Sequence, residues 1–251
     1  MHRFFVSPGD INKEEGKAII SGDTALHISR VLRLQKGDSI ILADGSGNAY
    51  LSIILDIEKY KILAELKEPV REKSEPATRV ILAQGLAKGE KMDHIVQKCT
   101  ELGIAEIIPL VCERTVVRLS SQKVPGKIKR WQKISLAAAE QSQRDRVPTI
   151  KELSTIEEVL SGKNDQTLCL FLWEQEKKQG LKEILSNNPA HEVLLLVGPE
   201  GGFSEAEADF ALSYGAFPVT LGPRVLRTET ASPAALTMVL YELDDLGGVY
   251  E

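Results

Sequence analysis

Clustered metal ligands and disulfide patterns are missing from this 251-residue sequence. Its three cysteines, Cys99, Cys112 and Cys169, lie far apart and form no CxxC pair. The four histidines show no HExxH or comparable ligand spacing. Structural zinc needs closely spaced Cys and His ligands, and a disulfide framework needs paired cysteines. We therefore expect no metal site and a reducing compartment.

Long apolar runs and an N-terminal targeting pattern are also absent. No apolar stretch approaches the roughly 20 residues that span a bilayer. The N-terminus, MHRFFVSPGDINKEE, turns acidic too early for a signal peptide. We expect a cytoplasmic protein that does not associate with a membrane.

Overall positive charge is lacking as well, since the formal net charge is -5. Such a balance argues against non-specific binding of nucleic acid by the whole surface. Between Arg114 and Arg146, however, basic residues prevail and only Glu140 and Asp145 oppose them. This stretch is interpreted either as a phosphate-contacting surface or as a solvated helix face, and its local excess of charge favours the first interpretation.

The N-terminal part of the chain shows the pattern of a small antiparallel barrel. Strands are predicted at Asp38–Ala43, Asn48–Ile57 and Lys61–Leu66, and a short helix at Asp23–Val31. The glycines of Asp44–Gly47 suit a hairpin turn between the first two strands. The polar, proline-flanked segment EPVREKSEP at 68–76 has the composition of a linker. We predict one domain over residues 1–71 and a second over 72–251.

Three arginines of the first domain are candidates for a basic patch. Arg30 and Arg33 follow His27 just before the first predicted strand, and Arg3 lies near the N-terminus. On charge alone, ordinary solvated arginines explain them better than a binding patch.

The second domain alternates strands with helices. A strand at Thr78–Gln84, an amphipathic helix at Lys88–Leu102 and a strand at Glu106–Leu110 form a βαβ unit, which implies a parallel sheet. A long helix is predicted at Lys127–Gln143. Further strands are predicted at Gln166–Trp173, Val193–Val197 and Phe217–Leu221.

A glycine-rich loop, Gly198–Gly202, follows the strand Val193–Val197. It is neither a Walker A loop nor a GxGxxG fingerprint, so phosphate cradling is unsupported. Ser204 and Glu207 predict a capping box for the following helix. Spacing leaves two interpretations open: a tight strand-to-helix turn, or a site whose amides bind a polar ligand.

A second loop, Leu221–Ala231, is longer than the usual connections of about 2–6 residues in such domains. It contains Arg224, Arg227 and Glu229. The final helix is predicted to begin at Ser232, with Pro233 at its first position. Because both loops follow strands of one sheet, we expect them at its carboxyl edge, where ligands bind. Function is favoured over a solvated flap for this second loop.

These motifs together resemble a known family. GPEGGFSEAE followed by LGPRVLRTETA is similar to the RsmE family of ribosomal RNA uracil-N3 methyltransferases, within the SPOUT superfamily. HRFF, HISRVLRLQKGD, KMDHIVQKCTELGI and AAEQSQR match in order, so the resemblance spans essentially the whole chain. One departure is Gln143, where the family usually has glycine.

The resemblance implies an α/β fold: a trefoil-knotted SPOUT methyltransferase domain with a mostly parallel sheet, preceded by a small PUA-like β-barrel that binds RNA. It implies S-adenosyl-L-methionine as cofactor, 16S ribosomal RNA of the small subunit as substrate, and a homodimer. The implied cofactor residues are Leu172, Glu174, Gly198, Pro199, Glu200, Gly201, Gly202, Leu221, Gly222, Leu226, Thr228 and Ala231. The candidates for RNA contact are Arg3, Arg30, Arg33, Arg114, Arg144 and Arg224.

The chemistry of uridine N3 suggests three catalytic candidates. N3 must lose its proton before it attacks a methyl donor. We expect Arg227 to stabilise charge on the base carbonyls and Glu229 or Glu140 to take the proton. Alternatively, Glu229 braces the loop by pairing with Arg224 or Arg227. Rival hypotheses are a SPOUT enzyme with a ribose 2′-O or guanine N1 target, a non-catalytic RNA-binding assembly factor, and a nucleotide-dependent hydrolase or dehydrogenase.

Overall fold

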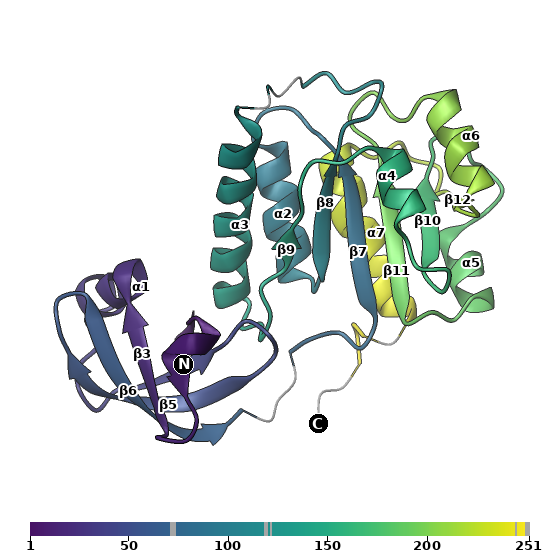
Figure 1. Ribbon diagram of the computed structural model, residues 1–251. Coiled ribbons are helices and arrows are strands. Elements are labelled where there is room, and N and C mark those ends of the chain that lie inside the picture. The colour runs from purple at the N-terminus through teal and green to yellow at the C-terminus, as the bar shows by residue number, and fades with distance from the viewer. Residues whose placement is uncertain (71–73, 118–119, 121, 244, 249–251) are drawn as a thin grey trace. The chain divides into compact units, whose positions relative to one another are not determined.

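The computed structural model describes residues 1–70, 74–117, 120, 122–243 and 245–248, and divides into two compact units (Figure 1). The first comprises Met1–Glu75 and Ala139–Val147, and the second comprises Pro76–Ala138 and Pro148–Glu251. The predicted domain boundary, between residues 71 and 72, lies outside the described residues.

The first unit is built on a six-stranded sheet of order β1-β4-β5-β6-β3-β2. Its strands are β1 Arg3–Phe5, β2 Ile11–Asn12, β3 Lys17–Ser21, β4 Ser39–Ala43, β5 Ala49–Ile57 and β6 Lys61–Pro69. The three strands predicted from the sequence are confirmed as β4, β5 and β6. β1, β2 and β3 were not predicted; β1 and β2 have only three and two residues, too few for a clear alternation of apolar residues. All pairings are antiparallel except that of β1 with β4, which is parallel.

The local chemistry of the first unit explains its turns and its curvature. The Asp44 carboxylate accepts hydrogen bonds from the amide of Ser46 (2.8 Å) and the amide of Asn48 (3.2 Å), which fixes the predicted hairpin turn. Two register shifts between β5 and β6 bend the sheet. The predicted helix at 23–31 is present as α1 Gly22–Leu26 and a π-helical turn at His27–Val31. Its Ala25 and Ile28 join a core formed by Phe4, Ile40 and Leu42.

The second unit contains a fully parallel sheet of order β12-β10-β11-β7-β8-β9. The strands are β7 Arg79–Gly85, β8 Glu106–Leu110, β9 Thr149–Ile150, β10 Leu168–Leu172, β11 Glu192–Val197 and β12 Phe217–Val219. The predicted parallel sheet is therefore confirmed. Alternate residues of the central strands join two separate core clusters, one on each face. This burial on both faces explains the continuous apolar runs in the sequence.

Helices cover both faces of this sheet (Figure 1). They are α2 Lys91–Glu101, α3 Val124–Gln141, α4 Ile156–Ser161, α5 Leu181–Asn187, α6 Glu205–Ser213 and α7 Thr228–Glu242. Residues of α2, α3, α5 and α7 pack into one core cluster, and residues of α4 and α6 pack into the other. No helix among the described residues has the length and apolarity to cross a membrane.

The start of the last helix corrects the sequence prediction. Helix α7 begins at Thr228, so Pro233 lies inside the helix and Ser232 is not its N-cap. The Ser232 hydroxyl instead donates to the side-chain oxygen of Gln84 in β7 and to the Thr228 carbonyl (3.2 Å). These buried hydrogen bonds stabilise a further turn of helix before the proline. The connection after β12 is therefore shorter than predicted and spans residues 220–227.

Candidate active site

Three connections of the second unit leave the sheet at the same edge. Leu172, the last residue of β10, is in register with Val197 of β11 and with Val219 of β12. Since these strands are parallel and adjacent, the residues that follow them lie side by side at the carboxyl edge. The expectation that the two glycine-bearing loops share one edge is confirmed, and the connection after β10 joins them.

The first loop, Gly198–Gly202, packs closely against its neighbours. Gly202 has a φ of 68°, and a Cβ at this residue would lie 2.6 Å from Oε2 of Glu174. A Cβ at Gly201 would lie 3.0 Å from the Cβ of Arg114. The predicted capping box follows this loop, with the Ser204 amide donating to Glu207 (2.8 Å) and the Glu207 amide donating to Ser204 (3.2 Å). The glycines therefore permit both the turn and the close approach of Glu174.

A buried hydrogen-bond network connects the first loop to the start of α7. The Thr228 hydroxyl donates to the Gly198 carbonyl (2.7 Å), and the Gln84 amide donates to the Thr228 hydroxyl (2.9 Å). Gln84 and Ser232 are fully buried. Gln84 was not predicted as a site residue, and Ser232 was predicted only as the start of the last helix. Gln84 is a polar residue at the end of an apolar strand, and this pattern is the sequence signal that identifies it.

A lysine that was not predicted as a site residue bridges the first loop and the first turn of α7. The Nζ of Lys91, in the first turn of α2, lies 3.0 Å from Oε1 of Glu200 and 3.2 Å from Oε2 of Glu229. The Lys88 amide also donates to Glu200 (3.0 Å). Glu229 is thus braced, as the alternative interpretation predicted, but its partner is Lys91 and not an arginine.

The electrostatics of Glu200 and Glu229 follow from this bridge. Burial acts to raise the pKa of Glu229, but its own backbone amide, Lys91 and Arg227 outweigh burial and hold the pKa below its ordinary value. The pKa of Glu200 is likewise lowered by the Lys88 amide and Lys91 against the effect of burial. Both side chains are therefore charged at neutral pH, and the lowered pKa makes Glu229 a weak proton acceptor.

Glu140 has the opposite character. Burial raises its pKa, and a hydrogen bond from the Phe5 backbone and the nearby His27 only partly offset that rise. A carboxyl group with a raised pKa is better matched to proton transfer near neutral pH. Glu140 belongs to the first unit, whereas Arg227 and Glu229 belong to the second.

The raised pKa of Glu140 leads to a prediction about stability. When folding raises the pKa of a group, the folded protein becomes less stable as the pH increases from the group's unfolded-state pKa through its folded-state pKa. We therefore expect Glu140→Gln to raise the melting temperature at pH 7 by about 1–3 °C, because glutamine carries no charge to bury. Below the ordinary pKa of glutamate the difference should vanish. Melting curves of both proteins from pH 3 to 8 would show this, and an equal difference at every pH would contradict it.

The arginines selected from the sequence divide into exposed and buried sets. Arg224 and Arg227 are exposed in the connection before α7, and Arg114 is exposed beside Gly201. Arg30 and Arg33 are exposed in the first unit. Arg118, in the basic stretch of the sequence, lies outside the described residues.

Arg3 and Arg144 lie instead in a buried ion-pair network of the first unit. Arg3 pairs with Asp145 and donates to the Arg144 carbonyl (3.1 Å), and Arg144 pairs with Glu75 (2.5 Å). Arg3 is 7% exposed and Arg144 is 3% exposed. This burial leaves little of either guanidinium group for a phosphate. Sequence alone does not reveal it, because the partners lie far away along the chain.

The remaining side chains around the two loops supply apolar surface. Leu172, Leu221 and Ala231 are half-buried against the core, and Leu226 is half-buried in the connection before α7. Glu174 adds an exposed carboxylate above Gly202. Apolar surface, carboxylates and loop backbone together suit a ligand with a flat heterocycle and polar hydroxyl or ammonium groups.

Comparisons with known families agree with this architecture. The RNA methyltransferase domain family matches residues 73–240, and the RNA methyltransferase PUA domain family matches residues 20–67. The chain thus has the two domains of an RNA methyltransferase, a PUA domain followed by an RNA methyltransferase domain.

More specific relatives narrow this class. Ribosomal RNA small subunit methyltransferase E of Bacillus subtilis is 36% identical over 99% of both chains. The crystal structure of the Neisseria gonorrhoeae protein of that name, bound to S-adenosyl methionine, has a TM-score of 0.86 and 30% identity, over 96% of this chain and 97% of the other. A putative methyltransferase from Legionella pneumophila, in complex with bound SAM, has a TM-score of 0.84 and 30% identity over the same shares. The chain belongs to the ribosomal RNA small subunit methyltransferase E family.

Proposed function

We propose that this protein transfers the methyl group of S-adenosylmethionine to N3 of a specific uridine in 16S ribosomal RNA of the small subunit. The proposal depends on one observation: the Gly198–Gly202 loop is bonded to the start of α7. The Gln84–Thr228–Gly198 hydrogen bonds and the Lys91 bridge join them. Membership of a family whose Neisseria gonorrhoeae member binds this cofactor supports it.

The residues at the sheet edge fit the proposed cofactor. Its adenine needs apolar surface and backbone partners, which Leu172, Leu221, Leu226 and the Gly222 backbone would supply. Its ribose hydroxyls and ammonium group need acceptors, for which the Glu174 carboxylate is placed beside Gly202. The cofactor supplies a methyl group that its sulfonium already activates for transfer. We also propose that the chain around this site is threaded as the trefoil knot of the SPOUT superfamily.

Catalysis then rests on charge and on positioning by this chain's own residues. As N3 of uridine loses its proton, negative charge spreads to the base carbonyls, and the exposed guanidinium group of Arg227 stabilises it. The raised pKa of Glu140 suits it to accept a proton, whereas the charged Glu229 orients the start of α7 through Lys91. Alignment of N3 with the methyl group supplies much of the remaining acceleration.

The RNA surface and the assembly are parts of the same proposal. Arg30 and Arg33 of the first unit, with Arg114 and Arg224 of the second, are the exposed candidates for phosphate contact. Ribosomal RNA as substrate implies a cytoplasmic site of action. For the homodimer, support comes from α7, where Met238 is 43% exposed and Tyr241 is 65% exposed one turn later. Val225, in the connection before α7, is 92% exposed.

The proposed dimer surface leads to a prediction. We expect the double variant Met238→Asp/Tyr241→Asp to sediment as a monomer where the unmodified protein sediments as a dimer, since buried charges disfavour association. Tyr60→Asp, at a tyrosine that is 54% exposed in the first unit, is the matched control and should leave the dimer intact. If the double variant still sediments as a dimer, α7 is not part of the dimer interface.

Two measurements test the proposed activity against its rivals. Titration calorimetry should detect binding of S-adenosylmethionine, whereas a non-catalytic assembly factor predicts none. Mass spectrometry of nucleosides from treated ribosomal RNA should find 3-methyluridine. A ribose-methylated nucleoside or 1-methylguanosine would instead identify a different target.

A further inference from the structure

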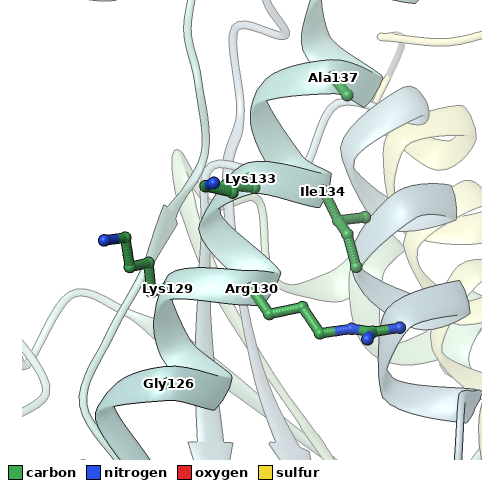
Figure 2. A pocket seen from close by; sticks show the side chains of 6 residues that line it. All are labelled: Gly126, Lys129, Arg130, Lys133, Ile134 and Ala137. Carbon is green, nitrogen blue, oxygen red and sulfur yellow. The ribbon is translucent and has the colours of Figure 1, made fainter.

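The exposed face of α3 is a basic helical surface of the second unit that the activity above does not use. Lys129, Arg130 and Lys133 project from it around a hollow of about 490 Å³ (Figure 2). Gly126, Ile134 and Ala137 complete the lining. These six residues are called the α3 face below.

The charge of the α3 face is largely uncompensated. Residues 124–138 contain no acidic side chain, in a chain whose net charge is -5. In the part of the chain that the structure describes, Arg130 pairs with Asp93 of α2 (2.5 Å), but no carboxylate pairs with Lys129 or Lys133. These two lysines are four residues apart, so they lie on one side of the helix about 6 Å apart at Cβ. Such a row of free cations is suited to an extended polyanion.

The α3 face also adjoins the candidate active site. Asp93, which holds Arg130 and also accepts a hydrogen bond from the Trp131 indole (3.0 Å), lies in the first turn of α2. Lys91, in that same turn, bridges Glu200 and Glu229. Arg130, which lies between the two lysines in the sequence, is therefore held beside the helix end that carries Lys91.

We propose that the α3 face binds the phosphate backbone of the RNA substrate beside the target nucleotide. This inference rests on the proposed function, and it adds a phosphate-binding surface on the catalytic unit to the RNA contacts considered above. Lys129 and Lys133 supply mobile cations, Arg130 is oriented by Asp93, and Ile134 with Ala137 gives an apolar floor for a ribose.

The test uses the full chain and the double variant Lys129→Ala/Lys133→Ala. Binding to a fluorescent fragment of small-subunit ribosomal RNA is measured across a salt series. We expect the dissociation constant to rise about tenfold and the slope of log K against log salt to fall by about 1.4–1.8, which corresponds to two lost phosphate contacts. KM for RNA should rise, while kcat at saturating RNA and the affinity for S-adenosylmethionine stay unchanged.

The control is Lys151→Ala/Lys182→Ala, which removes two exposed lysines of the same unit from outside the α3 face. It should keep the affinity and the salt slope of the unmodified protein. Unchanged affinity and slope in the α3 variant would overturn the proposal. Loss of self-association with an unchanged salt slope would also overturn the proposal, because it would show that the α3 face binds a second copy of the chain. If the unmodified protein binds RNA without methylating it, the proposed function fails while the binding test of the α3 face still holds.

Discussion

Replacing Arg227 by alanine should lower kcat by about 10²–10³-fold and leave the affinity for S-adenosylmethionine within about threefold. Removing one preorganised donor to a developing negative charge costs about this much. Arg227 precedes α7 and is exposed at the sheet edge, and its positive charge helps to lower the pKa of Glu229. Single-turnover methylation with saturating RNA measures the chemical step directly.

Arg227→Lys provides the matched control for this prediction. Lysine keeps the positive charge but lacks the planar pair of donors, so we expect an intermediate rate. Calorimetry on both variants separates cofactor binding from catalysis. If Arg227→Ala kept kcat but lost the cofactor, Arg227 would belong to the cofactor site and not to charge stabilisation.

Replacing Lys91 by methionine should weaken the binding of S-adenosylmethionine by about tenfold at pH 7.5. The substitution leaves two partly buried carboxylates, Glu200 and Glu229, facing each other without their shared cation. Because Lys91 is partly exposed to solvent, which weakens an ion pair, we expect the loss of affinity to be about tenfold and no larger. The first loop and the start of α7 then separate more readily, and the proposed cofactor site is less preorganised.

Lys88→Met is the control for Lys91→Met. The Lys88 side chain is exposed, and its contact with Glu200 is made by the backbone amide, which the substitution retains. The pH dependence gives a second check. The pKa values of Glu200 and Glu229 are lowered in the folded protein. Their ion pairs with Lys91 therefore stabilise the protein fully above the ordinary pKa of glutamate, and this stabilisation is lost as the pH falls through the lowered pKa values. The difference between variant and unmodified protein should therefore shrink in acid, and an equal affinity at pH 7.5 would contradict the bridge.

The sequence predicted those features that local chemistry determines. The parallel sheet followed from apolar strands that alternate with amphipathic helices. The hairpin at Asp44–Gly47 and the capping box at Ser204 and Glu207 followed from turn and cap residues. The common edge of the two loops followed from the direction of parallel strands.

Features set by distant residues were not predictable in the same way. The start of α7 was placed too late because Pro233 normally opens a helix, while hydrogen bonds of Thr228 and Ser232 to Gly198 and Gln84 extend it. Lys91 looked like one more surface lysine, since its partners are over 100 residues away along the chain. Arg3 and Arg144 looked exposed for the same reason, because Asp145 and Glu75 meet them only after folding.

The most direct test of the central claim is transfer of a labelled methyl group to unmodified small ribosomal subunits, followed by mapping of the labelled base. The purified protein is incubated with the subunits and with methyl-labelled S-adenosylmethionine, with Arg227→Ala in parallel. We predict label on N3 of a single uridine in 16S ribosomal RNA, and a rate reduced at that same uridine in the variant. Label on a ribose, on another base or on no nucleotide at all would contradict the account.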